Sequence, residues 1–148
     1  MTDDAVSAAP EPLVDEILGG TDPVRAAREG LPPRVLDRVS DAVFGPSPTA
    51  DDARALARAL GVSERTLTRR KARPPEPLPP QQSDRLLLLA ETYDLAVRAL
   101  DGEDRARAWL ARPHRLLGGE APVARLDTLA GVREVQTVLY HVEFGMAA

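Results

Sequence analysis

The sequence predicts an all-α protein in two parts, an N-terminal helix-turn-helix domain followed by a small helical domain. The composition is rich in Ala, Leu and Arg and holds only 3% aromatic residues, which favours helices over sheets. Apolar residues recur at i, i+3, i+4 and i+7 along several segments, the spacing of one helix face. The run RPPEPLPP, residues 73–80, separates these segments, and we expect residues 74–80 to form a stiff proline linker.

Length and composition exclude several classes of protein. The 148 residues suit one ordinary domain or two small helical ones. With no Cys and two separated His, the chain has no disulfide, and we expect no metal site and no cofactor. No apolar run approaches the roughly 18 residues of a membrane span, and the acidic first 20 residues lack the basic start of a secretory signal. We therefore expect a cytoplasmic protein without membrane contact.

The first 45 residues predict an arm and two helices. Residues 1–21 hold Ala, Pro, acidic residues and a Gly19-Gly20 break, so we expect a flexible N-terminal arm. Asp22 can cap a helix that has Pro23 at its first position and ends at Gly30. After Pro32-Pro33 a second helix reaches Gly45, with an apolar face of Val35, Leu36, Val39 and Val43.

Residues 49–72 predict two short helices that meet at a tight turn. Thr49 and Asp52 have the spacing of a capping box ahead of an apolar helix face made of Ala53, Leu56, Ala57 and Leu60. Gly61 can end that helix, and Ser63 can cap a second one that runs to about Ala72. We expect the helix-turn-helix domain to span residues 22–73.

Residues 81–148 predict a second helical domain. A long amphipathic helix carries Leu86, Leu89, Ala90, Tyr93, Ala96, Val97 and Leu100 at helical spacing and ends at Gly102. A shorter helix with Trp109 and Leu110 ends at Arg112-Pro113, and Leu116-Leu117-Gly118-Gly119 forms a turn. After a turn of helix near Leu126, Gly131 precedes the last helix, whose inward residues are Val132, Val135, Val138, Leu139 and Val142.

Charge is distributed unevenly along the chain. The net charge is −4, yet residues 53–73 carry seven basic side chains and one acidic one, whereas residues 1–52 carry four basic and eleven acidic ones. Only charges within about 10 Å of a phosphate backbone act strongly at physiological salt, so a short basic island between acidic flanks is typical of a local phosphate-binding element.

The basic island coincides with the predicted helix-turn-helix. Ala57 supplies the small side chain needed where the helices cross, and Gly61, four residues later, tolerates the positive φ of the turn. The second helix would then enter the major groove of DNA. Our candidate DNA-binding residues are Ser63, Arg65, Thr66, Thr68, Arg69, Arg70 and Lys71. The alternative is a helical hairpin whose basic face is merely solvated.

Residues 81–148 show no pattern of catalysis. They contain no Ser-His-Asp order, no Gly-rich phosphate loop and no paired carboxylates in an apolar setting. An enzyme using His114 or His141 remains an alternative, but neither has an acid or a thiol that the sequence places beside it. We expect no catalytic residues, and we expect that the chain is not an enzyme.

The second half resembles a known family. Residues 109–145 resemble the toxin-binding domain of the Xre/MbcA/ParS antitoxins. The resemblance lies in Trp109-Leu110, Pro113, Leu116-Leu117-Gly118-Gly119 and Pro122, followed by a last helix that starts near Gly131 and ends at Gly145. In that family an Xre-like helix-turn-helix precedes this domain, and the same order occurs here. The basic residue that relatives often carry before the terminal Gly is absent, since the segment reads Tyr140-His141-Val142-Glu143-Phe144.

The resemblance implies partners and a mechanism. It implies a RES-domain toxin, an NAD-consuming or ADP-ribosylating enzyme, whose NAD pocket the C-terminal end of this chain covers. It also implies a homodimer that binds operator DNA in its own promoter, and a hetero-oligomer with the toxin. The implied toxin-binding residues are Trp109, Arg112, Leu117, Gly118, Gly119, Tyr140, His141, Glu143, Phe144, Gly145 and Met146.

Two interpretations of the second half remain open on the sequence. Small residues and an apolar C-terminal end suit the surface of a protein-binding module, whereas the same glycines could be ordinary helix ends with Phe144 covering the core. The alternative function is a stand-alone helix-turn-helix regulator whose C-terminal domain dimerises or senses a ligand.

Overall fold

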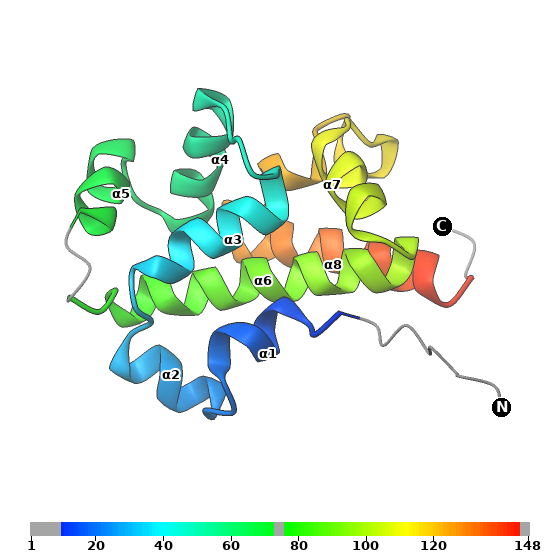
Figure 1. The fold of residues 1–148 in the computed structure, drawn as a ribbon. Coiled ribbons are helices and arrows are strands. Elements are labelled where there is room, and N and C mark those ends of the chain that lie inside the picture. Colours follow the sequence, from blue (N-terminus) through cyan, green and yellow to red (C-terminus); the bar gives the residue numbers. More distant parts are fainter. Residues whose placement is uncertain (1–9, 73–75, 146–148) are drawn as a thin grey trace, which may run out of the picture.

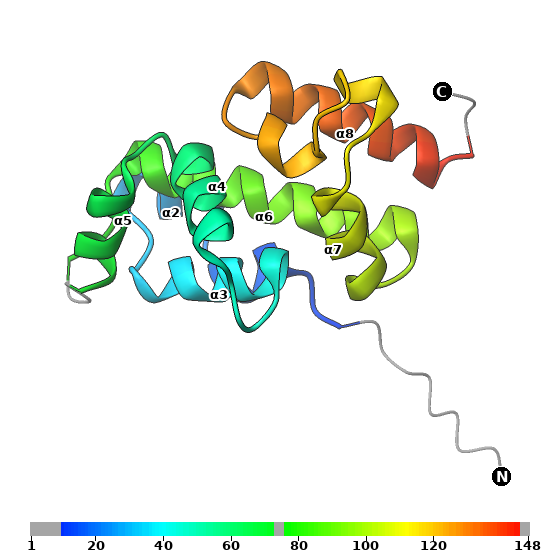
Figure 2. The same ribbon diagram turned by 90° about the horizontal axis from the view of Figure 1, so that it is seen from above.

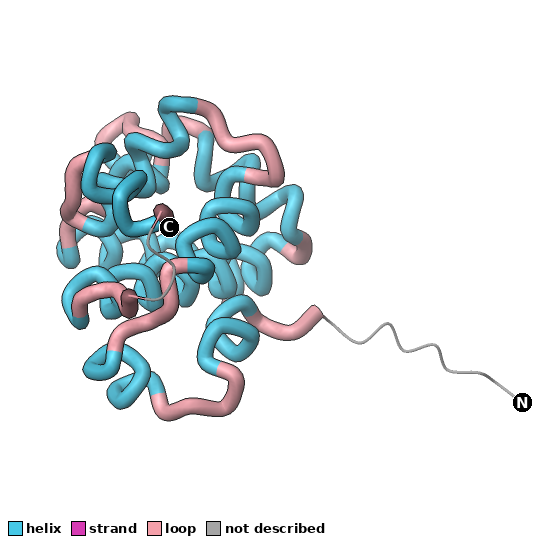
Figure 3. Tube along the Cα trace, turned by 60° about the vertical axis from the view of Figure 1, so that its left-hand side comes forward, coloured by secondary structure: helices cyan, strands magenta, loops and turns pink. Residues whose placement is uncertain are grey.

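The helices are arranged around one long central helix. The structure, a computed structural model, describes residues 10–72 and 76–145, and these residues form helices and loops without any strand (Figures 1 and 3). This confirms the predicted all-α class. In chain order the elements are α1 (Leu13–Leu18), α2 (Pro23–Glu29), α3 (Arg34–Phe44), α4 (Ala50–Leu60), α5 (Glu64–Lys71), α6 (Pro80–Leu100), α7 (Glu103–Ala111), the 3-10 helices η1 (Arg115–Leu117) and η2 (Pro122–Arg125), and α8 (Leu129–Glu143).

The central helix α6 is covered by other helices on most of its surface. Its 21 residues contact α1, α2, α3 and α4 from the first half of the chain and α7 and α8 from the second half. A helix that is apolar on most sides is stable only when it is enclosed in this way. The buried positions of α6 are accordingly distributed around it: Ser83, Leu86, Leu87, Leu89, Ala90, Thr92, Tyr93, Asp94, Leu95 and Ala96.

Helix α8 lies beside α6 and runs in the same direction (Figure 2). Three hydrogen bonds follow the pair from one end to the other. The Arg85 side chain donates to the Asp127 carbonyl (3.1 Å), Gln136 Nε2 donates to Thr92 Oγ1 (3.1 Å), and Arg98 Nε donates to the Glu143 carboxylate (3.3 Å). These contacts fix the C-terminal end of α8 relative to the centre of the molecule.

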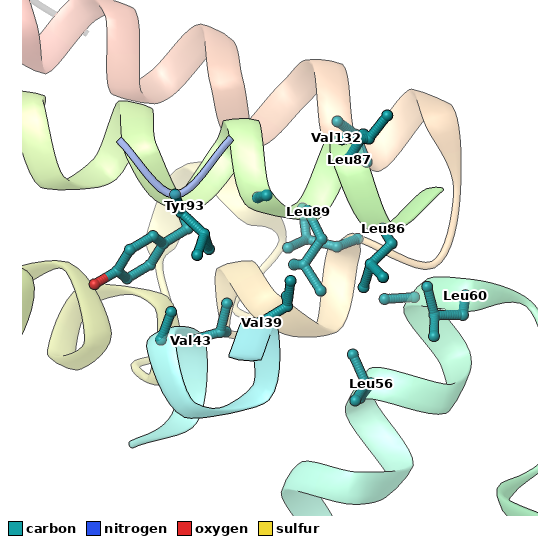
Figure 4. Close-up of a cluster of buried hydrophobic side chains, with 14 of the residues drawn as sticks. Val39, Val43, Leu56, Leu60, Leu86, Leu87, Leu89, Tyr93 and Val132 are labelled. Carbon is teal, nitrogen blue, oxygen red and sulfur yellow. The ribbon is translucent and has the colours of Figure 1, made fainter. Parts of the chain in front are cut away.

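The two predicted domains share one hydrophobic core. Figure 4 shows Val39 and Val43 of α3 and Leu56 of α4 facing the same cluster as Leu86 and Leu89 of α6, and Val132 of α8 belongs to that cluster too. We expected separate packing on either side of a proline linker. The difference arises because α6 begins directly after the prolines and is long enough to bury residues toward both halves.

The proline segment itself is packed against the helix-turn-helix half. Pro74 and Pro75 lie outside the described residues, but Leu78 is only 1% exposed and its N–H donates to the Leu31 carbonyl (2.8 Å). A Cβ on Gly30 would lie 2.3 Å from the Leu78 carbonyl oxygen, so only glycine fits there. The described part of the expected linker is therefore a fixed part of the fold.

Part of the expected flexible arm is a docked helix. Helix α1 places Leu13 in the core at 2% exposure, and the Asp94 carboxylate of α6 accepts hydrogen bonds from the backbone N–H groups of Leu13 (2.7 Å) and Val14 (2.9 Å). Burial raises the pKa of Asp94, and these two N–H donors partly offset that rise. No local pattern indicates this contact, because the capping carboxylate lies about 80 residues away in the chain.

Most of the predicted helix ends are confirmed, but α8 begins at Leu129 after its cap Thr128, so Gly131 lies inside the first turn of α8 and not before the helix as we predicted. Asp22 accepts from the Arg25 N–H ahead of α2, and the Thr49–Asp52 capping box at the start of α4 has both of its hydrogen bonds. Gly61 ends α4 in the left-handed conformation, with φ of 72°. In the part of the chain that the structure describes, no helix has both the length and the apolar character to cross a bilayer.

Removing the Asp94 carboxylate should release α1. Asp94→Ala leaves the N–H groups of Leu13 and Val14 without an acceptor in a half-buried setting, at a cost of about 1–3 kcal/mol. We expect hydrogen exchange at these two amides to accelerate by at least about tenfold, measured by NMR. Asp84→Ala, an exposed carboxylate of the same helix, is the matched control and should leave both rates unchanged.

Candidate functional site

Helices α4 and α5 form the helix-turn-helix that the sequence predicts. The Val62 N–H donates to the Ala57 carbonyl (3.0 Å) across the turn at Gly61, and Ser63 caps α5 by accepting from the Thr66 N–H. Ala57 (2% exposed) and Leu67 (4% exposed) are buried, which seats α5 against α4. Helix α5 lies at one end of the molecule (Figure 1), and its exposed residues are Glu64, Arg65, Thr68 and Arg69.

The candidate DNA-binding residues of α5 differ in exposure and in their partners. Arg65 and Arg69 are exposed and make neither an ion pair nor a hydrogen bond with another described residue. Lys71 is bound to Asp37 of α3 (Nζ to Oδ1, 3.1 Å). Arg70 is half-buried, and its Nε has no hydrogen-bond partner among the residues described.

The polar side chains at the start of α5 serve the fold. Ser63 Oγ and Thr66 Oγ1 lie 3.0 Å apart in the helix cap, and Thr68 Oγ1 donates to the Glu64 carbonyl (3.0 Å). The Glu64 carboxylate lies 3.7 Å from Arg54 Nε of α4. The structure thus keeps Ser63, Thr66 and Thr68 on the predicted helix but gives each a local partner. Their contacts with DNA stay predictions.

A second candidate surface is the C-terminal end of α8. Tyr140 (46% exposed) and Phe144 (68% exposed) stack with ring centroids 6.3 Å apart and an interplanar angle of 7°. Val142 beside them is 42% exposed, so our prediction that it points inward is wrong. Exposed aromatic rings gathered at one end of a fixed helix are typical of a protein-binding surface. Phe144 does not cover the core, which excludes that interpretation of it.

The other predicted residues at this end have mixed surroundings. His141 is half-buried, and Glu143 is half-buried and paired with Arg98 (3.3 Å). Gly145 is exposed with φ of 65°, a conformation that favours glycine. Met146 lies outside the described residues.

A groove adjoins the aromatic pair. Its volume is about 370 Å³, and Tyr140 and Gln136 of α8, Glu91 of α6 and Asp15 of α1 contribute to its walls. Burial raises the pKa of Glu91, with a smaller contribution from the nearby negative charges of Asp84 and Asp94. Helix α1 therefore shapes the surface next to the aromatic pair, which the sequence did not indicate.

The double-glycine turn is held to α8 by Arg125. The Arg125 guanidinium pairs with Glu134 of α8 and lies 3.6 Å from a Glu120 carboxylate oxygen. The hydrogen bond to Glu134 raises the pKa of Arg125. Gly118 and Gly119 are exposed and adopt positive φ of 67° and 77°. We did not single out Arg125 from the sequence, because no spacing distinguishes it from the other arginines.

The remaining residues of the predicted toxin-binding set divide between core and surface. Leu117 is fully buried, so the structure corrects its assignment: it supports the turn from inside and offers no surface to a partner. Trp109 is half-buried with its ring edge toward His114 (centroids 5.5 Å apart), and Arg112 is exposed. His114 Nδ1 accepts from the Leu116 N–H (3.2 Å) and so stabilises the turn.

Two family models match the chain, one after the other. The Antitoxin Xre-like helix-turn-helix domain matches residues 22–91, and the Antitoxin Xre/MbcA/ParS C-terminal toxin-binding domain matches residues 95–145. The first match extends past the proline segment and into α6, whereas we had expected the first domain to end at residue 73. Residues 1–21, including α1, lie outside both matches.

Curated relatives resemble the chain over most of its length. One, named Antitoxin Xre, from Photorhabdus laumondii, is 28% identical over 122 residues, which cover 81% of this chain and 77% of the relative. Another of the same name, from Yersinia enterocolitica, is 28% identical over 128 residues, covering 86% and 82%. Each alignment is long enough to include residues of both matched domains of this chain.

Replacing Gly131 should disturb the start of α8. A Cβ there would lie 1.7 Å from the Arg125 carbonyl oxygen, so α8 or the Arg125 loop would have to move. We expect Gly131→Ala to lower the free energy of unfolding by about 3 kcal/mol in a urea titration. Gly145→Ala meets no atom within 4 Å and bears only the cost of its positive φ, about 1–2 kcal/mol. Equal losses for the two variants would contradict the close approach.

Proposed function

Because the chain belongs to the Xre/MbcA/ParS antitoxin family, with an Xre-like helix-turn-helix domain and a C-terminal toxin-binding domain, we propose that it neutralises a RES-domain toxin and represses its own promoter. The toxin would be an NAD-consuming or ADP-ribosylating enzyme. The antitoxin would cover its NAD pocket with its C-terminal end, so the chain itself performs no chemistry.

The observation that carries the toxin-binding proposal is the outward aromatic pair at the end of α8. Tyr140 and Phe144 are large, stacked and exposed, and α8 is fixed to α6 by the Arg98–Glu143 ion pair close by. A rigid aromatic anchor loses little conformational entropy on binding, which is why such residues dominate protein interfaces. The groove beside Tyr140 would give the partner a second point of contact.

The second part of the proposal is operator binding by α5. Arg65 and Arg69 face outward from this helix, and Arg58 of α4 is exposed beside the turn. Residues 53–73 carry seven basic side chains and one acidic one, so this segment keeps a net positive charge even though Lys71 pairs with Asp37 of α3. DNA binding implies action in the cytoplasm, and a homodimer would match an operator built of inverted repeats.

The stand-alone regulator is not favoured by any observation. Residues 95–145 match a domain described as toxin-binding. This match favours a protein toxin as the partner of the exposed aromatic pair. We therefore retain a single functional proposal.

Toxin binding should depend on the aromatic pair. Tyr140→Ala and Phe144→Ala leave the core intact because both rings are exposed, yet each should weaken binding to the proposed RES-domain toxin by roughly thirtyfold or more. The measurement is calorimetric titration of the purified toxin, with cellular NAD content as a second readout. Val24→Ala, which removes an exposed apolar side chain from α2, is the control. Unchanged affinity in both aromatic variants would contradict the proposed interface.

Operator binding should depend on Arg69 through charge alone. A titration of upstream promoter DNA at several salt concentrations measures how many phosphates the chain contacts. We expect Arg69→Ala to reduce the slope of log affinity against log salt by about 0.9, the value for one phosphate contact on duplex DNA. Arg105→Ala removes an equally exposed charge from α7 and should leave the slope as it is. If the slope is unchanged in Arg69→Ala, Arg69 does not contact a phosphate and this prediction is wrong.

A further inference from the structure

We propose that Arg65 is the residue that determines DNA sequence specificity, by reading a guanine base in the major groove. This inference rests on the proposed operator binding by α5 and adds to it the residue and the base that are recognised. It depends on which side chains in the first turn of α5 are already engaged within the fold and which way the others point.

The first turn of α5 leaves one long polar side chain uncommitted. Ser63 and Thr66 are joined in the helix cap, with Ser63 Oγ accepting from the Thr66 N–H (3.1 Å) and lying 3.0 Å from Thr66 Oγ1. The Glu64 carboxylate is 3.7 Å from Arg54, and as an anion it would also be repelled by phosphates. Of these first-turn residues, only Arg65 has its side chain unpaired within the described chain.

Arg65 also points away from the body of the protein. Leu67 is buried against α4, and Arg65 precedes it by two residues, which correspond to roughly 200° of rotation about the helix axis. Its side chain therefore leaves the helix on nearly the opposite side from the core. When a recognition helix enters the major groove, residues near its N-terminus are the ones that meet base edges.

Position along α5 distinguishes Arg65 from Arg69. Arg69 leaves the helix on a similar side but lies one turn later, about 6 Å farther along the axis. Arg70 and Lys71 follow it, so the C-terminal turn holds three basic residues and, although Lys71 pairs with Asp37, is suited to the phosphate backbone. Arg65 and Arg69 thus form a pair with the same chemistry, similar exposure and different expected roles.

The chemistry of arginine selects guanine. The planar guanidinium can donate two parallel hydrogen bonds to O6 and N7 of guanine, whereas adenine presents a donor in place of O6. Lysine keeps the positive charge but not this planar fork. Replacement by lysine therefore separates base reading from simple attraction to phosphate.

The experiment compares base preference and affinity in four full-length proteins. Wild type, Arg65→Ala, Arg65→Lys and Arg69→Ala are each used to select duplexes from a library with a randomised segment. Binding to the selected duplex is then measured by fluorescence anisotropy, before and after each G·C pair is replaced by A·T. Circular dichroism spectra check that the variants, all altered at exposed positions, keep the helical content of the wild type.

For the wild type we expect one G·C pair in each half-site of the inverted repeat whose replacement weakens binding by roughly five- to a hundredfold. Arg65→Ala and Arg65→Lys should lose most of that preference, and Arg65→Lys should keep the wild-type salt dependence. Arg69→Ala should bind every duplex more weakly while keeping the preference for the same pair.

Two outcomes would overturn the inference and are distinguishable from each other. If Arg65→Lys binds as tightly as the wild type and selects the same sequence, Arg65 only contacts phosphate and the inference fails, while operator binding stands. If the wild type selects no duplex even at low salt, the proposed DNA-binding function fails, and the role of Arg65 fails with it.

Discussion

The structure depends on the enclosure of α6. This helix has buried residues toward both halves of the chain, so neither half can cover it alone. Helices α1 to α4 of the first half and α7 and α8 of the second half pack around it. The Leu31 N–H donates to Ser83 at its start, and Asp94 near its end caps α1. Exposing any large part of α6 would place an apolar surface in water, which makes the helix the element that joins the halves into one body.

That constraint determines how the two functional surfaces are related. The two family matches meet within α6, at residues 91 and 95, so the domain boundary lies inside a continuous helix. The recognition helix α5 lies near the start of α6, and the aromatic end of α8 lies near its other end (Figure 1). A protein bound at one end would therefore keep a defined orientation relative to DNA bound at the other. Arg85, in the first half of α6, links the two matched regions: its side chain donates to the Asp127 carbonyl and lies close to Gly61 in the turn between α4 and α5.

Charged residues in this protein divide into those that stabilise the fold and those that remain for partners. Arg38 pairs with Glu16, Lys71 with Asp37, and Arg125 with Glu134 and Glu120, and each pair joins segments distant in the chain or closes a loop. Exposed pairs of this kind add little stability individually, but they do fix where side chains point. Lys71 is thus less available to DNA than its place in a basic run suggests, and the exposed charge of α5 is concentrated at Arg65 and Arg69.

The sequence by itself determined most of the helices and their ends, because caps such as Thr49–Asp52 and turn glycines such as Gly61 act through neighbours within a few residues. The spacing of Trp109, Pro113, Gly118 and Gly119 also identified the C-terminal family domain, which follows the helix-turn-helix in the chain. Only the tertiary structure decided that α1 docks on Asp94, that Leu78 anchors the proline segment, that Leu117 is internal and that Arg125 holds the double-glycine turn. Most of these contacts join residues far apart in the chain, and the burial of a side chain depends on all the elements around it. A local sequence pattern therefore cannot predict them.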